Sequence, residues 1–361
     1  MTSTIRGVRI AGVASAVPSD VVTAVETGRG MGMTEKESLR STKMTGVARR
    51  HVAPPGMCTT DMAYHAAAKL LDEQGWDRAG VQALVMVTQT PDYFLPATAS
   101  PLHARLGLSS NCAAFDVTLG CSGYIYGLWL CGSLIASGAI ERALLLTGET
   151  ASWLCAPQDR STMFLFGDAG TATTLERDPA APPMHFVIGS DGAGSGALMI
   201  PGGAYRQCVT PGILERRAEA DGALRNPLDL HMDGAEVFKF TLERVPAMME
   251  ELLAASGWTL DSMDAFVPHQ ANLYMLQVLS QQMKIPAEKL ILSLDEYGNT
   301  SSASIPLALN HRLAGRLRAE AASLVMAGFG VGWSWAAVAA KLGPLLMPEI
   351  VVLETAAAAK A

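Results

Sequence analysis

The chain has 361 residues, of which 49% are hydrophobic and 17% are charged, and this composition excludes an intrinsically disordered protein. Such a length allows about two domains, or one large duplicated domain. The 27 Lys and Arg residues are outnumbered by 34 Asp and Glu residues. The net charge of −7 excludes nucleic-acid binding as a main role, because phosphate backbones are bound by basic surfaces.

The six cysteines include no CxxC pair, which argues against a zinc knuckle or a thioredoxin motif. We interpret them as reduced thiols of a cytoplasmic protein. The N-terminal residues show no long apolar segment after a basic start, so we expect no signal peptide. The most apolar window, residues 321–340, contains three glycines and is typical of two buried strands joined by a turn, so we expect no membrane association.

In chain order, the first informative feature is an internal repeat. The segment LLDEQGWDRAGVQALV at residues 70–85 aligns without a gap with LLAASGWTLDSMDAFV at residues 252–267, and six of the sixteen positions are identical. Each segment is typical of a helix end stopped by Gly, then a loop, then a buried strand. Coincidence between two common helix–loop–strand units is the alternative interpretation.

The similarity continues more loosely around this repeat, where ALLLTGE at 143–149 parallels SLVMAGF at 323–329. We therefore predict two similar α/β halves, residues 1–182 and 183–343, with sheets and helices in layers. A tail follows at residues 344–361, and its AAAAKA end is predicted to fray. The polar, aperiodic stretch at residues 202–229 predicts an inserted surface loop.

The first candidate catalytic residue is Cys121, between an apolar strand-like run at 113–117 and a helical pattern at 124–134. Glycines on both sides allow a tight strand-to-helix turn. A thiol at this place faces the helix N-terminus, whose free N–H groups favour the thiolate, so Cys121 is a candidate nucleophile. The alternative is a buried structural cysteine, which is our interpretation of Cys112 and Cys131.

Two further candidates, His269 and Asn299, lie in the second half of the chain. His269 follows the apolar strand DAFV and opens a helical pattern, and strand ends are where sites collect in α/β sheets. A satisfied structural histidine is the alternative. Asn299 lies in the turn before a helix start of small residues, where it either contributes to a site or caps the helix.

Glycines also follow the strand SLVMA, in the motif GFGVG. They allow backbone N–H groups to approach a ligand closely. Because no helix and no acidic partner follow, the motif is not a dinucleotide-binding fingerprint. A backbone oxyanion donor is the better functional interpretation.

These motifs, in this order, resemble the thiolase superfamily, and most of all the β-ketoacyl-acyl-carrier-protein synthase III family of condensing enzymes. The resemblance covers about residues 1–343 and extends to MTGVARRH at 44–51, FGDAG at 166–170 and EVFK at 236–239. It implies a duplicated thiolase-like α/β fold, layered α-β-α-β-α, with two pseudo-equivalent mixed sheets.

By this resemblance, Cys121 attacks an acyl thioester and becomes the acyl-enzyme, while His269 and Asn299 bind the carbonyl of a malonyl thioester that loses CO₂. The backbone N–H groups of Cys121 and Val331 form the oxyanion hole. The resemblance further implies acyl-CoA and acyl carrier protein as partners, no metal or cofactor, and a homodimer in which Leu95 lines the neighbour's tunnel. The expected role is decarboxylative condensation in fatty-acid or secondary-metabolite biosynthesis.

The resemblance also supplies candidate substrate-binding residues, namely Arg40, Arg49, Phe238, Asn272 and Leu95. The chain departs from the family where coenzyme A, the carrier protein or the acyl chain is held, which predicts a specialised relative unless the changes are neutral. The departures are Arg40 for Trp, Met44 for Arg, Ala235 for Asn, Tyr274 and Gln281 for basic residues, and Leu95 for Phe. Candidates for docking a carrier protein are Arg49, Arg216, Arg217 and Lys284.

Two other functions remain open from the sequence. In one, the acyl group on Cys121 passes to an oxygen or nitrogen nucleophile, with His269 as general base. In the other, the chain is a non-catalytic binding subunit. The joint presence of Cys121, His269 and Asn299 argues against the second.

Overall fold

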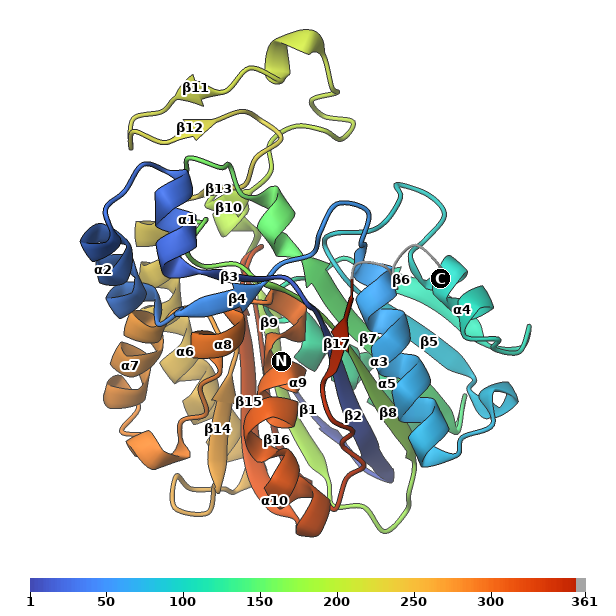
Figure 1. Ribbon diagram of the computed structural model, residues 1–361. Helices are drawn as coiled ribbons and strands as arrows, with labels where there is room; N and C mark the ends of the chain where they lie inside the picture. Colours follow the sequence, from blue (N-terminus) through green and yellow to red (C-terminus); the bar gives the residue numbers. More distant parts are fainter. Residues whose placement is uncertain (355–361) are drawn as a thin grey trace.

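The computed structural model describes residues 1–354, and its core is a pair of β-sheets with helices between and outside them (Figure 1). The predicted frayed end, AAAAKA, lies outside the described residues. Within the described part of the chain, no helix combines the length and apolar character that crossing a bilayer requires.

The first sheet has six strands in the order β17-β2-β8-β7-β5-β6. The strands β7, β5 and β6 run parallel, whereas β8 is antiparallel to both β2 and β7. Every residue of β5 is buried, as expected for a strand covered on both faces. The bounds are β2 Val8–Pro18, β5 Ala83–Val87, β6 Ala113–Val117, β7 Arg142–Thr150, β8 Asp168–Arg177 and β17 Val351–Leu353.

The second sheet has five strands in the order β1-β9-β16-β15-β14, and only β14 and β15 are parallel. Their bounds are β1 Thr2–Ile5, β9 Met184–Ser190, β14 Ala265–Pro268, β15 Ala322–Gly330 and β16 Ser334–Leu342. The hairpin β15–β16 confirms that the most apolar window forms two strands and a turn. Three two-stranded ribbons lie outside the sheets: β3 Val21–Thr23 with β4 Arg49–His51, β10 Leu198–Met199 with β13 His231–Met232, and β11 Arg217–Ala218 with β12 Leu224–Arg225.

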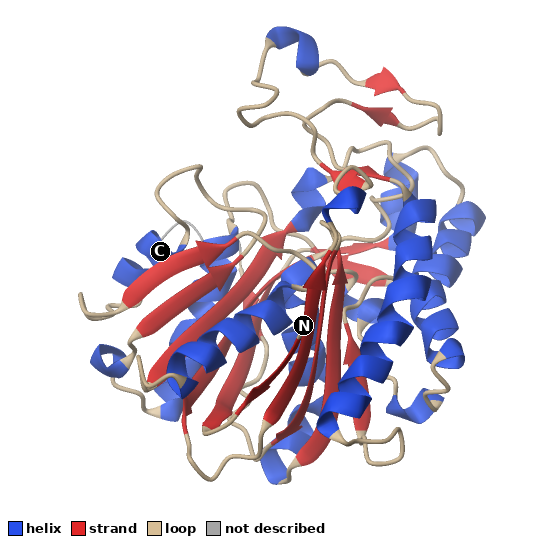
Figure 2. Cartoon of the chain, turned by 180° about the vertical axis from the view of Figure 1, so that it is seen from behind, coloured by secondary structure: helices blue, strands red, loops and turns tan. Residues whose placement is uncertain are grey.

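The helices form three layers around the two sheets. Helices α5, α9 and α10 lie between the sheets, and their apolar side chains join strands of both in one core. Helices α3 and α4 cover the outer face of the first sheet, and α6 and α7 that of the second (Figures 1 and 2). The predicted α-β-α-β-α layering is confirmed. The bounds are α1 Ala24–Gly30, α2 Glu35–Thr45, α3 Thr59–Gln74, α4 Ala99–Arg105, α5 Gly123–Ala136, α6 Gly234–Ser256, α7 Leu273–Gln282, α8 Leu294–Tyr297, α9 Ser304–Ala308 and α10 Ala314–Ala319.

The two segments of the sequence repeat adopt the same local structure. Helix α3 ends at Gly75 and helix α6 at Gly257, both glycines in the left-handed conformation that favours Gly as a helix stop. A loop then leads into the buried strand β5 in one segment and β14 in the other. The boundary at residues 182 and 183 stays a prediction, and it falls between β8 and β9.

The two sheets exchange their edge strands across that boundary. Strand β1 from the start of the chain pairs with β9, and β17 from the tail pairs with β2. The sequence analysis placed no strand in the tail, because three residues (VVL) are too short for a detectable period. These residues form a strand because they pair with the buried strand β2. The local sequence does not show that pairing.

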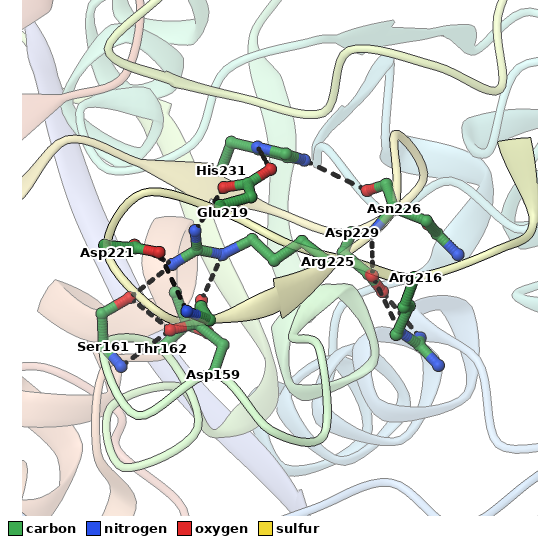
Figure 3. Close-up of polar contacts among 11 residues, drawn as sticks. Asp159, Ser161, Thr162, Arg216, Glu219, Asp221, Arg225, Asn226, Asp229 and His231 are labelled. Carbon is green, nitrogen blue, oxygen red and sulfur yellow. Dashed lines mark hydrogen bonds and ion pairs between the residues drawn. The ribbon is translucent and has the colours of Figure 1, made fainter.

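Residues 202–229 form a surface segment, as predicted, which is here termed the flap and contains the short ribbon β11–β12. In Figure 1 the ribbon β11–β12 stands apart from the body at the top of the molecule. Arg225 of the flap is 4% exposed and donates to Asp159 of the body over 2.8 Å and to Glu219 over 2.6 Å (Figure 3). The charge-assisted bond to Asp159 joins residues 66 positions apart in the sequence, so composition alone did not indicate it.

Candidate active site

Cys121 lies in the turn that joins β6 to α5, as the sequence predicted. The turn is tight, since the N–H of Gly123 donates to the carbonyl of Gly120 over 2.7 Å. A Cβ at Gly123 would lie 2.5 Å from the side chain of Val87 in β5, so no larger residue fits there without a shift. The turn leaves Cys121 only 8% exposed.

The second half of the chain closes over this turn with the end of β15. A Cβ added at Gly328 would lie 2.6 Å from the carbonyl oxygen of Cys121, and one at Gly330 would lie 2.8 Å from its Sγ atom. Gly330 also has a φ of 155°, which side chains with a Cβ rarely adopt. The glycines of GFGVG therefore allow the backbone of one half to touch the thiol of the other.

Burial raises the pKa of the Cys121 thiol to about 11. Hydrogen bonds from the backbone N–H groups of Val331 and Cys121 and from the hydroxyl of Ser301 oppose this rise, while the carboxyl of Glu149 adds to it. The backbone N–H of Cys121 acts in the direction that we expected at the start of the helix, but burial of the sulfur outweighs it in the free protein. Desolvation penalises the charged form more than the helix end and the N–H groups stabilise it.

His269 follows β14 directly and is 1% exposed. Its backbone N–H donates to Ala327 of β15 over 2.7 Å, and its ring Nδ1 lies 2.7 Å from the hydroxyl oxygen of Ser304. Burial lowers the pKa of His269 to about 3, although a hydrogen bond with the backbone of Ser301 acts in the other direction. The imidazole is therefore neutral at physiological pH, with one ring nitrogen that donates and one that accepts.

Asn299 is buried after α8, and its backbone is held against the first half of the chain. The N–H of Asn299 donates to Leu165 over 2.8 Å, and its carbonyl accepts from Gly167 over 3.1 Å. In the side chain, Oδ1 accepts from the N–H of Ser301 over 2.9 Å, and Nδ2 donates to the carbonyl of Ala271 over 3.4 Å. One amide N–H of the side chain remains to donate to a ligand.

Ser301 is the residue that brings the three candidates together. It lies in the short helix η6, Ser301–Ala303, with a φ of 49° that is unusual for a residue other than Gly. Its hydroxyl contacts the thiol of Cys121, its backbone contacts the ring of His269, and its N–H donates to Asn299. Sequence reasoning missed Ser301 and Ser304, although both lie in the GNTSSAS motif, since only the asparagine was singled out.

This arrangement combines a nucleophile with hydrogen-bond donors. The thiol of Cys121 is a more nucleophilic group than the neighbouring serine hydroxyls, and the N–H groups of Cys121 and Val331 already point at its sulfur. A neutral imidazole and an amide are linked to this thiol through Ser301, and both can stabilise a developing negative charge on oxygen. Among residues 1–354, no group of three His, Cys, Asp or Glu side chains is arranged to hold a metal ion.

The structure places the substrate-binding candidates on several elements around the site. Arg40 is exposed on α2, and Leu95 is exposed in the loop after β5. Arg49 of β4 forms an ion pair with Glu296, so its guanidinium already has a partner. The ligand roles of these residues stay predictions.

Two of those candidates have structural partners within the protein. Asn272 caps α7, because its Oδ1 accepts from the N–H of Met275 over 2.8 Å. Phe238 of α6 stacks on Tyr274 with ring centroids 5.7 Å apart. A substrate that used either side chain would have to share it with these contacts.

The candidate docking residues of the flap are paired with acids of the flap itself. Arg216 binds Asp229 through two hydrogen bonds of 2.7 and 2.8 Å, and Arg217 pairs with Glu215 over 3.1 Å. Lys284 is exposed after α7. The net basic character that a docking surface needs is thus reduced on the flap.

Comparison with known protein families gives two matches along the chain. The model of 3-oxoacyl-[acyl-carrier-protein] synthase III matches residues 115–192, and the model of the C-terminal part of this synthase matches residues 253–342. The first range contains Cys121, and the second contains His269, Asn299 and Val331.

Curated relatives and solved structures agree with these matches over nearly the whole chain. The chain is 35% identical over 347 residues to β-ketoacyl-[acyl-carrier-protein] synthase III 5 of Streptomyces coelicolor, with 95% of this chain and 98% of the relative covered. The crystal structure of a 3-oxoacyl-(acyl-carrier protein) synthase from Burkholderia xenovorans LB400 superposes with a TM-score of 0.91 at 42% identity, covering 98% and 99% of the two chains. The priming β-ketosynthase of the R1128 polyketide biosynthetic pathway superposes with a TM-score of 0.80 at 29% identity, covering 95% and 98%.

Proposed function

The chain belongs to the 3-oxoacyl-[acyl-carrier-protein] synthase III family of the thiolase superfamily, and from this membership we propose that Cys121, His269 and Asn299 carry out its chemistry. The protein is an acyltransferase of the decarboxylative condensing type. The observation that carries the assignment of residues is Ser301, which contacts all three side chains.

In the first step, the sulfur of Cys121 attacks the carbonyl carbon of an acyl thioester. The new S–C bond forms, the bond to the leaving sulfur breaks, and the thiol proton goes to the leaving thiolate. The oxyanion of the tetrahedral intermediate accepts hydrogen bonds from the N–H groups of Cys121 and Val331. Their contact with the sulfur in the free protein supports this role, because they need no rearrangement to reach the adjacent oxyanion.

In the second step, a malonyl thioester loses CO₂ and the electron pair of the broken C–C bond becomes an enolate. The ring N–H of His269 and the free amide N–H of Asn299 donate to the enolate oxygen. A neutral imidazole can fill this role, since one of its ring nitrogens still carries an N–H that donates a hydrogen bond. The carbon then attacks acyl-Cys121, and the cysteine leaves as a thiolate that takes up one proton.

The substrates, the assembly and the compartment belong to the same proposal. Acyl-CoA supplies the acyl group, and acyl carrier protein carries the malonyl group. The protein acts as a homodimer in the cytoplasm, where its six free thiols would stay reduced. Exposed apolar side chains next to Leu95 support an intermolecular contact at that loop.

The test has two parts, which separate acylation from condensation. The protein is incubated with a panel of acyl-CoAs, and fragmentation of the tryptic peptide 106–142 locates the adduct, because this peptide also contains Cys112 and Cys131. Release of CO₂ from a malonyl carrier thioester is then measured. We expect Cys121→Ala to remove the adduct, and His269→Ala or Asn299→Ala to retain it while CO₂ release falls about 10² to 10³-fold.

The matched control is Cys208→Ser, since Cys208 is an exposed cysteine of the flap and should leave both activities unchanged. An adduct on Cys121 without malonyl-dependent CO₂ release would point instead to acyl transfer to an oxygen or nitrogen nucleophile. If no acyl-CoA formed an adduct, the remaining interpretation would be a non-catalytic binding subunit.

A further inference from the structure

Glu149 is a buried acidic residue near the site that the reaction described above does not use. It lies at the end of β7 and is 1% exposed. Its carboxyl accepts hydrogen bonds from the Thr90 hydroxyl over 2.8 Å, the Gln89 N–H over 3.1 Å and the Ser302 hydroxyl over 3.1 Å. The hydroxyl of Thr88 adds a longer contact of 3.3 Å.

These donors come from two segments that face the nucleophile from different halves of the chain. Gln89 follows β5, and a Cβ added at Gly120, the residue before Cys121, would lie 2.2 Å from its Oε1 atom. Ser302 follows Ser301, whose hydroxyl oxygen would lie 3.0 Å from the same added Cβ. The carboxyl of Glu149 therefore joins these two segments. They are here termed the two walls of the Cys121 turn: residues 88–90 after β5, and residues 301–302.

The charge of Glu149 also acts on the nucleophile. Its carboxylate contributes to the high pKa of Cys121, because a negative charge disfavours a neighbouring thiolate. Burial raises the pKa of Glu149 itself to about 7, against the hydrogen bonds from Thr90, Gln89, Ser302 and Thr88 that stabilise its ionised form. The carboxyl thus changes its charge near neutral pH.

Other titratable groups lie on the elements packed around this end of β7, and the two acids among them that are described next have hydrogen-bond or ion-pair partners other than Glu149. Asp168 of β8 accepts from Ala53 and Ser152, and Asp61 of α3 pairs with Arg105. Further titratable groups on or next to these elements include Cys58 and His65 at and within α3, Tyr124, Tyr126 and Cys131 of α5, and His269 after β14. Within residues 1–354, the hydrogen bonds to the carboxyl of Glu149 all come from uncharged donors.

We propose that Glu149 is a positioning residue of the condensation site, which holds the wall of Gln89 against the wall of Ser301 and Ser302 and whose ionisation controls how readily Cys121 loses its proton. This inference rests on the proposed role of Cys121 as the nucleophile. The direction of the effect is set by charge. When Glu149 is ionised, the thiolate of Cys121 is disfavoured; when Glu149 is protonated or replaced by an amide, the thiolate forms at lower pH.

The experiment measures alkylation of Cys121 by iodoacetamide from pH 6 to pH 10, read by fragmentation of peptide 106–142, in the folded protein and in Glu149→Gln. The amide keeps one oxygen, which can accept some of these hydrogen bonds, but carries no charge. We expect the alkylation profile of Glu149→Gln to move to lower pH by on the order of one unit, so that alkylation near pH 8 is about tenfold faster. A profile that coincides with that of the parent protein overturns the proposal.

The matched control is Asp168→Asn, which removes another buried carboxyl from the adjacent strand. Its pKa is also raised by burial, to about 6, but its hydrogen bonds lie on Ala53 and Ser152 rather than at the Cys121 turn. We expect its Cys121 profile to follow that of the parent protein. An equal shift in both variants would mean that the effect is a general loosening of the core, and the proposal would be wrong.

A second variant covers the case in which Glu149→Gln does not fold. Ser302→Ala removes one bond to the ionised carboxyl, so Glu149 stays protonated to higher pH and alkylation at pH 7 to 8 should become faster. An unchanged or slower rate there overturns the proposal. Because iodoacetamide needs no acyl substrate, these results stand apart from any failure of acyl-CoA to modify Cys121.

The role of Glu149 in holding the two walls together is tested separately, by the rate at which acyl-CoA acylates Cys121. Glu149→Ala removes every hydrogen bond to the carboxyl, whereas Glu149→Gln keeps an acceptor for the N–H of Gln89. We expect Glu149→Ala to acylate about tenfold more slowly than Glu149→Gln at a temperature at which both variants remain folded. Equal rates would contradict a positioning role.

Discussion

At the scale of single residues, the reactivity of Cys121 is decided by its neighbours rather than by its own segment. The local sequence predicted the turn and the helix after it, and both are present. It also led us to expect a thiolate, whereas burial against the end of β15 raises the pKa of the thiol. The residues responsible are more than two hundred positions away in the chain, so no local pattern could reveal their effect.

Gly330 offers a direct test of that close approach. In Gly330→Ala, the new Cβ would lie 2.8 Å from Sγ of Cys121, at a φ of 155° that alanine rarely adopts. We expect acylation of Cys121 to fall about 100-fold, because a displacement of the order of 1 Å at a reacting atom costs about that much. Formation of the acyl-enzyme, followed by mass spectrometry, is the measurement.

Gly315→Ala in α10 is the matched control for that substitution. Nothing lies within 4 Å of a Cβ built at Gly315. Its acylation rate should equal that of the parent protein. If Gly330→Ala also acylated normally, β15 would not confine the thiol as described here.

At the scale of elements, the flap shows how ion pairs can order a segment that composition marks as a loop. Its ribbon β11–β12 is short, and Arg225 attaches it to the body through Asp159, with Glu219 and Asp221 of the flap completing the cluster (Figure 3). A buried guanidinium that lacked these carboxylates would be costly, so the cluster holds the flap in one position.

We expect Arg225→Met to destabilise this attachment by about 3 kcal/mol, since removing one partner of a buried ion pair leaves the other uncompensated. The measurement is the rate of proteolysis within residues 202–229 under native conditions, which should rise. Arg217→Met is the control, because its pair with Glu215 is exposed and contributes little. Equal protection of both variants would contradict a role for Arg225 in attaching the flap.

At the scale of the whole molecule, the loop after β5 leaves three consecutive large side chains in solvent, Tyr93, Phe94 and Leu95, with Phe94 81% exposed. Such a patch is typical of an interface. We expect the protein to sediment as a dimer at micromolar concentration, and Phe94→Glu to shift it towards the monomer.

Val209→Glu of the flap is the control for that experiment, because it adds the same charge at another exposed apolar side chain. It should leave the sedimentation coefficient of the dimer unchanged. A parent protein that sediments as a monomer would refute the proposed dimer.

The stability of the whole molecule should depend on pH through Glu149. Its pKa is about 7 in the folded protein, above the ordinary value of 4.5, so between these pH values the folded state binds a proton that the unfolded chain releases. The stabilisation of the folded state by this proton is present in full below pH 4.5, and it is lost as the pH rises through 7. Urea denaturation measures the free energy of unfolding of the parent protein and of Glu149→Gln at pH 4.5 and at pH 8. We expect the difference, parent minus variant, to be about 3 kcal/mol larger at pH 4.5 than at pH 8. A difference of the opposite sign would mean that Glu149 is ionised throughout this range.

The sequence by itself determined the duplication and the alternation of strands and helices, because both rest on local pattern: apolar periods and a glycine after each repeated helix. The order of its short motifs supplied the layered fold and the candidate residues Cys121, His269 and Asn299 through their resemblance to a known family. The tertiary structure decided what those patterns do. It revealed Ser301 and Glu149 as the links between the halves, paired the tail and the first strand with opposite sheets, and attached the flap through Arg225. The physical reason is that burial and hydrogen bonding depend on which distant segments come into contact, and desolvation at those contacts sets the charge of the thiol, the imidazole and the carboxyl.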